Sequence, residues 1–82
     1  MEFTDTLLKI GNTYYDHNKC YLAIDYYNKA LIIYEKEKGK VSIDYADTLH
    51  KIGEAYIKTD KYYRASVCFS KSKKIRKSLK WS

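Results

Sequence analysis

The sequence predicts an all-α fold built from two tandem antiparallel helix hairpins, four helices in all, stacked as an α-solenoid. The segments 5–11 and 47–53 read DTLLKIG and DTLHKIG, which places Gly11 and Gly53 42 residues apart. Apolar residues recur at spacings of three and four, and the chain has no proline. Self-similarity at a fixed period of tens of residues is typical of stacked repeats. We call positions 42 residues apart equivalent.

The first unit, residues 1–42, is predicted to form helices over residues 2–16 and 19–38. Apolar residues in the first of these are spaced by four, three and four, which places them on one face of a helix. Gly39 follows the second helix, and glycine is frequent just past a helix C-terminus. The apolar face of the first helix consists of Phe3, Leu7, Ile10 and Tyr14.

The second unit, residues 43–82, repeats this pattern. Ser42 is the expected N-cap of its first helix, because serine side chains accept hydrogen bonds from the N–H groups of a helix start. That helix carries Tyr45, Leu49, Ile52 and Tyr56 at the same spacing. Thr59 and Asp60 predict a turn, with Asp60 as a possible N-cap. The fourth helix is expected over residues 61–79, with a more polar face than the second helix.

The paired glycines predict close packing inside each hairpin. A glycine in mid-helix costs about 1 kcal/mol relative to alanine, so its presence at equivalent positions needs a packing reason. We expect Gly11 to face Ala23 and Gly53 to face Ala65, which would let the two helices of each hairpin approach closely.

The order of residue types resembles the tetratricopeptide repeat over almost the whole chain. The resemblance rests on Leu7, Gly11, Tyr14, Cys20, Ala23, Tyr27 and Ala30 in the first unit, and on Leu49, Gly53, Tyr56, Tyr62, Ala65, Phe69 and Ser72 in the second. Standard members repeat every ~34 residues. The 42-residue unit looks like the longer repeats of kinesin light chains, although Ser42-Ile43 replaces the His-Pro pair of that family's linkers.

The resemblance implies a binding surface lined by the first helix of each unit, which would take a peptide or a partner helix. It implies a non-enzymatic protein-binding module. We call this surface the first-helix groove. Its residues, carried over by position, are Leu8, Asn12, Tyr15, His50, Glu54 and Ile57.

Length and composition are those of one intracellular domain. A chain of 82 residues is a single domain, residues 1–82, that leaves much apolar surface for partners to cover. No apolar run is long enough to cross a bilayer, and the acidic N-terminus does not resemble a signal peptide, so we expect a cytoplasmic protein. The histidines and the two cysteines lie at no catalytic or metal-binding spacing, which predicts no catalytic residues, no metal and no cofactor.

Charge gives an alternative function. From Lys61 onward the chain has eight basic residues and no acidic one. Four of the basic residues fall on one side of a helix and form what we call the basic ridge. The ridge would bind nucleic acid, an anionic membrane surface or an acidic protein. Alternatively, it is a solvated helix end, where the helix dipole favours cations. Its residues are Lys73, Arg76, Lys77 and Lys80.

Self-association is the other expectation. A stack of two units is shorter than the three that repeat proteins usually need, and no polar capping helix is predicted after Leu79. The apolar face of that helix would then pair with another copy, giving a homodimer or a larger stack. The residues expected at this contact are Cys68, Ser72, Ile75 and Leu79.

Overall fold

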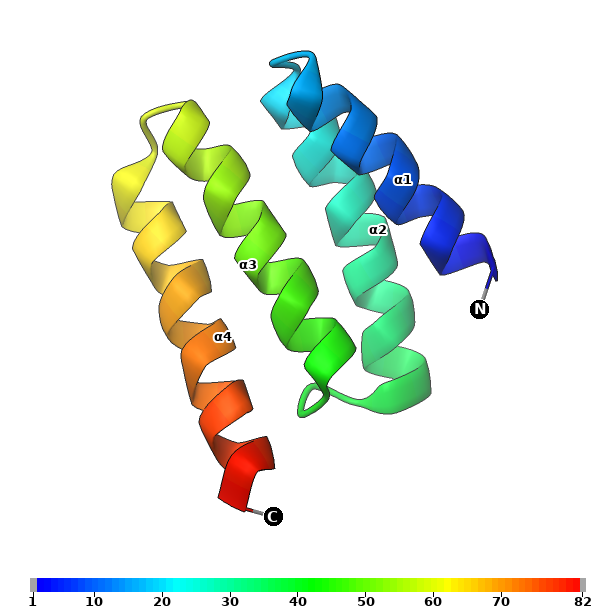
Figure 1. Cartoon of the computed structure of the whole chain (residues 1–82), viewed down its shortest axis with the longest axis vertical. Helices are drawn as coiled ribbons and strands as arrows, with labels where there is room; N and C mark the ends of the chain where they lie inside the picture. The colour runs from blue at the N-terminus through cyan, green and yellow to red at the C-terminus, as the bar shows by residue number, and fades with distance from the viewer. Residues whose placement is uncertain (1, 82) are drawn as a thin grey trace.

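The computed structural model describes residues 2–81, with the side chains of residues 3–80, and these residues form four helices. They are α1 (Glu2–Asp16), α2 (Cys20–Lys38), α3 (Ile43–Lys58) and α4 (Tyr62–Trp81). Each helix packs antiparallel to the one before it, and α2 lies between α1 and α3 (Figure 1). The described part is flat, about 37 × 30 × 15 Å. The predicted all-α class and the predicted helices are confirmed to within two residues at each end.

The two hairpin turns are built alike. Asn18 and Asp60, at equivalent positions, have φ values of 63° and 62°, in the left-handed region that Asn and Asp tolerate better than most residues. The next residue in each turn donates its N–H to the carbonyl of Tyr14 or Tyr56. The prediction of Asp60 as an N-cap is wrong, because α4 begins two residues later and the Asp60 carboxylate accepts a hydrogen bond from the Tyr62 hydroxyl instead.

Ser42 caps α3 as predicted. Its Oγ accepts a hydrogen bond from the Tyr45 N–H at 3.2 Å, and its backbone is extended. Gly39, which ends α2, has a φ of 83° that only glycine adopts without strain. The linker between the two hairpins is therefore set by a glycine stop and a serine start.

We expect Ser42→Ala to lower the free energy of unfolding by about 1 kcal/mol, because the α3 N-terminus loses its side-chain acceptor. Urea denaturation followed by circular dichroism measures the change. Ser42→Asp is the control, since aspartate also caps helices and should keep most of the stability. Equal loss in both variants would contradict a capping role.

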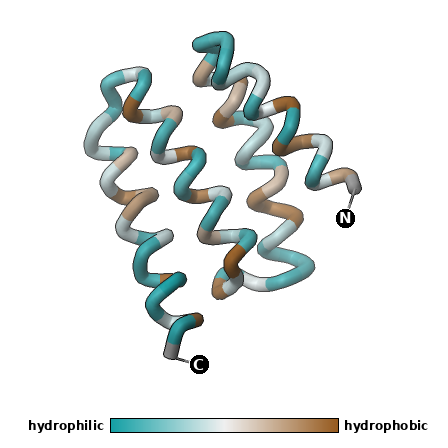
Figure 2. Tube along the Cα trace, in the orientation of Figure 1, coloured by the Kyte–Doolittle hydropathy of each residue, from teal (hydrophilic) through white to brown (hydrophobic). Residues whose placement is uncertain are grey.

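The hydrophobic core centres on α2. Its buried residues contact α1 on one side and α3 on the other, in two clusters that Tyr27 and Tyr34 anchor. In α4 only Ala65 and Ser72 are buried among the described side chains. Figure 2 shows the second half of α4 largely in hydrophilic colours. The expectation that the last helix is the least buried is confirmed.

The side chains that pack nearest to Gly11 and Gly53 are aromatic rings, not the predicted alanines. A Cβ added at Gly11 would lie 2.6 Å from Tyr27 Cε1, and one added at Gly53 would lie 2.7 Å from Phe69 Cε1. These ring atoms are nearer than any atom of Ala23 or Ala65. The residues that face the glycines therefore lie one helical turn later in the sequence than predicted. The packing reason for the glycines stands, and the two rings are themselves at equivalent positions.

Candidate partner-binding site

The first-unit residues of the groove are largely covered. Leu8 and Tyr15 are half-buried and pack against the core clusters that include α3 residues. Asn12 is half-buried, and its Oδ1 accepts a 2.6 Å hydrogen bond from the hydroxyl of the buried Tyr27. These side chains therefore hold the two units together as much as they offer a surface.

The Glu54 carboxylate is close enough to the Tyr27 hydroxyl to affect its pKa. Burial first, and then the Asp16 and Glu54 carboxylates, raise the pKa of Tyr27 to about 12. Burial and the Glu54 carboxylate also raise the pKa of Tyr15 above its ordinary value. Three predicted groove residues, Asn12, Tyr15 and Glu54, thus gather around the Tyr27 hydroxyl.

The Tyr27 shift predicts a loss of stability at high pH. Between pH 10 and about 12 the unfolded chain releases this proton while the folded chain retains it, so stability falls as the pH rises through that window. Unfolding measured at several pH values should show a smaller loss in Tyr27→Phe than in the parent. An equal loss in both proteins would contradict the assignment.

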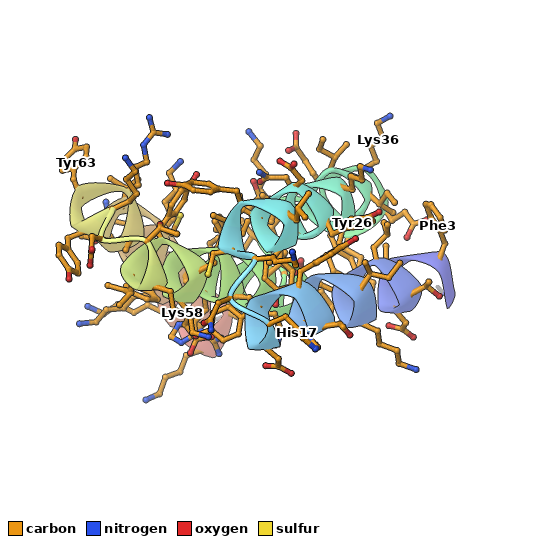
Figure 3. All side chains as sticks on the ribbon, turned by 90° about the horizontal axis from the view of Figure 1, so that it is seen from above. Phe3, His17, Tyr26, Lys36, Lys58 and Tyr63 are labelled. Atoms are coloured by element: carbon orange, nitrogen blue, oxygen red, sulfur yellow. The ribbon has the colours of Figure 1, made fainter. Side chains whose placement is uncertain are left out.

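Lys58 joins the two hairpins and was missed by the sequence analysis. Its Nζ lies 3.8 Å from the centre of the Tyr15 ring and donates to the Tyr15 carbonyl at 3.1 Å. It also reaches the Asn18 side chain at 3.4 Å. Figure 3 places Lys58 on the same side of the molecule as His17, opposite Tyr63 and Lys36. A lysine in the last turn of α3 gave no sign of this contact to α1.

The second-unit residues of the groove are exposed. The His50 ring lies 4.9 Å from the Phe69 ring, and its Nε2 lies 3.8 Å from a Glu54 carboxylate oxygen. Ile57 is 42% exposed and is one of several large apolar side chains that are exposed in the described part of the chain. The same three positions are covered in the first unit and open in the second.

An open cleft of about 340 Å³ lies between α3 and α4, and His50 is the second-unit groove residue that lines it. The sequence analysis assigned His50 to the groove and two of the basic residues to the ridge, and the structure brings them to one place. Phe69 was not predicted as part of a site. We call this the terminal cleft; it is lined by His50, Phe69, Ser72, Lys73 and Arg76.

All four residues of the basic ridge are exposed. Arg76 is partly occupied within the chain, because its guanidinium pairs with the Asp47 carboxylate on α3 and its Nε donates to Ser72 Oγ at 3.3 Å. Lys73 forms no ion pair with any residue that the structure describes. The ridge therefore divides into a part inside the terminal cleft, Lys73 and Arg76, and a part outside it, Lys77 and Lys80.

The residues expected at a self-association contact do not share one free surface. Ser72 is 2% exposed, and its hydroxyl donates to the Ala46 carbonyl at 2.8 Å, so it supports the α3/α4 hairpin. Its placement at a contact with another copy is corrected for this reason. Cys68, Ile75 and Leu79 are half-buried. Burial raises the pKa of the Cys68 thiol, with Lys71 opposing the shift.

Among the described residues, no cluster of His, Cys, Asp and Glu side chains is arranged to hold a metal ion. Within the same part of the chain, none of the helices has the length and apolar character needed to cross a membrane.

Comparison with protein families agrees with the architecture. The family model described as tetratricopeptide repeat matches residues 3–78. Searches of curated proteins and of solved structures returned no match. The family's repeats are non-catalytic and generally mediate protein–protein interaction. The resemblance to the kinesin light chain repeats stays a prediction. With a family match over nearly all its length and two stacked helix hairpins, the chain belongs to the tetratricopeptide repeat family.

Proposed function

We propose that the chain binds a peptide or helix of a partner protein, mainly through the open half of the first-helix groove. One observation carries the proposal. Leu8 and Tyr15 are half-buried and pack against a core cluster that includes Ile52 and Ala55 of α3, whereas their equivalents, His50 and Ile57, are exposed. In a stacked repeat such uncovered positions are where the next element would pack.

The chemistry of this surface suits a protein ligand. Ile57 and the Phe69 ring offer apolar contact, while His50 and Glu54 can form hydrogen bonds at the rim. Protein interfaces combine an apolar centre with polar groups around it. The surface adjoins a cleft, so a side chain of the ligand could be received as well as its backbone.

Selection of random peptides displayed on phage against the full chain tests the proposal. We expect enriched peptides to bind the parent and to lose at least tenfold in affinity against a His50→Ala, Glu54→Ala, Ile57→Ala variant. Tyr21→Ala, Leu22→Ala is the matched control, because these exposed α2 residues lie outside the cleft. Failure of enrichment, or equal binding to the triple variant, would contradict the proposal.

Self-association is a second proposal, with less support. The exposed apolar residues of the second unit could still pair between copies, although Ser72 cannot contribute. Sedimentation velocity at high micromolar concentration tests it. A homodimer or larger stack is the expected result under this proposal, and a monomer would exclude it.

Binding of nucleic acid or an anionic surface is supported by the exposed lysines of α4 alone. Half of the basic ridge lies in the terminal cleft, and Arg76 is already paired with Asp47. Phosphate binding would weaken steeply with salt, whereas binding through apolar contacts would change little. We therefore favour a protein partner over a polyanion.

A further inference from the structure

The packing of α3 on α2 gives a template for what the terminal cleft receives. One cluster brings Tyr45 of α3 to Tyr34 of α2. The other brings Ile52 and Ala55 of α3 to Tyr27 and its neighbours on α2. Thr48, which is 1% exposed, lies between Tyr45 and Ile52 on the same face of α3. The occupant of this junction is thus a helix that presents positions 45, 48, 52 and 55 to the second helix of the preceding unit.

The terminal cleft is the same junction one unit later. Its five lining residues are equivalent to Leu8, Tyr27, Ala30, Leu31 and Tyr34, all of them buried or half-buried in the first unit. In the second unit His50, Lys73 and Arg76 are exposed, Phe69 is half-buried, and Ser72 is covered by α3. By this equivalence, the shape of the cleft fits a helix laid along α4.

The chemistry of the junction has changed from apolar to basic. Lys73 stands where the first unit has Leu31, and Arg76 stands where it has Tyr34. Phe69 keeps the aromatic ring at the position of Tyr27. An occupant with apolar residues throughout would bury the Lys73 charge unpaired, which costs free energy.

A second copy of the chain is poorly suited to this cleft. In a head-to-tail stack its α1 would take the place of α3, with Phe3 at the position of Tyr45 and Thr6 at that of Thr48. Neither residue is acidic, so Arg76 and Lys73 would meet an aromatic ring and a hydroxyl. The acids already at the rim are Asp47, paired with Arg76, and Glu54, beside His50. The Lys73 ammonium forms no ion pair with a carboxylate of the described residues.

We propose that the terminal cleft binds an amphipathic helix of a partner protein, with acidic residues at two positions three apart and an aliphatic residue four positions later. One acid pairs with Lys73, the other joins Asp47 at the Arg76 guanidinium, and the aliphatic side chain meets the Phe69 ring. This inference rests on the proposed protein-binding function and names the chemistry of its partner.

A synthetic peptide derived from the template provides the probe. It spans residues 43–58 with Tyr45→Glu, Thr48→Glu and His50→Lys, and a lactam formed with loss of water joins the lysine amine introduced at position 50 to the Glu54 carboxyl. The bridge is needed because a 16-residue helix is marginal in water, and both positions are exposed in the folded chain. Fluorescence anisotropy measures its binding to the full chain.

Three further peptides serve as references. One has the sequence of residues 43–58 with His50→Lys as its single change, and the same bridge. Another has Ile43→Glu and Ile57→Glu in place of the two glutamates of the probe, at positions that are exposed in the folded chain. Its net charge equals that of the probe, but its added glutamates lie on a different face of the helix. The third spans α1, residues 2–16, and represents a second copy. We expect the acidic probe to bind about tenfold tighter than each, since it alone brings carboxylates to Lys73 and Arg76 in the cleft.

Variants of the chain locate the site. Lys73→Glu with Arg76→Gln should abolish the preference for the acidic probe. The control, Lys74→Glu with Lys77→Gln, makes the same change in charge on the same helix outside the cleft and should keep the preference. A probe with Thr48→Lys should regain affinity for Lys73→Glu. Circular dichroism confirms that each variant is folded.

Equal binding of all four peptides, equal losses in both charge variants, or strongest binding of the α1 peptide would overturn the inference. The last result would identify a second copy as the occupant. Peptides selected by phage display that depend on His50, Glu54 and Ile57 would leave the proposed function intact in those cases. If the acidic probe shows no preference and no selected peptide depends on His50, Glu54 and Ile57, the proposed function is excluded as well.

Discussion

Replacing Gly11 with leucine is expected to lower the free energy of unfolding by about 3 kcal/mol, the upper end of the usual cost of overpacking. An added Cβ would lie 2.6 Å from the ring of Tyr27, which is 2% exposed and held by its hydrogen bond to Asn12. Neither helix can yield without separating the hairpin. Urea denaturation followed at 222 nm measures the loss.

Gly53→Leu is the matched comparison. The facing ring, Phe69, borders the open terminal cleft and can move into it. We expect a loss of about 1 kcal/mol there, at the lower end of the overpacking range. A Gly11→Leu variant as stable as the parent, or one less affected than Gly53→Leu, would contradict this description of the two glycines.

Tyr27→Ala is expected to lower the free energy of unfolding by about 4 kcal/mol, because it removes the largest fully buried side chain of the core. A domain of this size has a total of roughly 4–12 kcal/mol, so the variant should be partly or fully unfolded at 25 °C. Thermal melting and the dispersion of amide signals in NMR spectra measure the outcome.

Tyr27→Phe separates packing from hydrogen bonding. It keeps the ring and removes only the hydroxyl that donates to Asn12, so we expect a loss of about 1 kcal/mol. The chain itself places phenylalanine at the equivalent position 69. If Tyr27→Ala were no worse than Tyr27→Phe, the ring would not be the anchor of the core.

The repeat pattern was sufficient to predict the fold. Spacing of apolar residues, the glycine stop at Gly39 and the serine cap at Ser42 are local signals, and local signals determine where helices begin and end. These local signals do not determine which turns of two neighbouring helices pack against each other. Gly11 meets Tyr27 rather than Ala23 because the crossing of two helices, which no single helix encodes, decides which turns face each other.

The sequence predicted several residues of the candidate site but not that they lie together. Sequence placed His50 on one surface and Lys73 on another, and only the packing of α3 against α4 shows that both line one cleft. Ser72 was misplaced because a serine in an apolar stripe gives no sign of whether its hydroxyl is satisfied inside the hairpin or exposed. Lys58 was overlooked because its partners belong to the other unit.

The central claim is that partners bind at the uncovered end of the stack, around His50, Ile57 and Phe69. Mapping of amide chemical shifts in the ¹⁵N-labelled full chain, titrated with a peptide selected against it, tests this most directly. The account predicts that the largest shifts fall on α3 and α4 at these residues, with little change around Tyr21 and Leu22. Largest shifts on α2 at Tyr21 and Leu22, with the cleft unaffected, would contradict it.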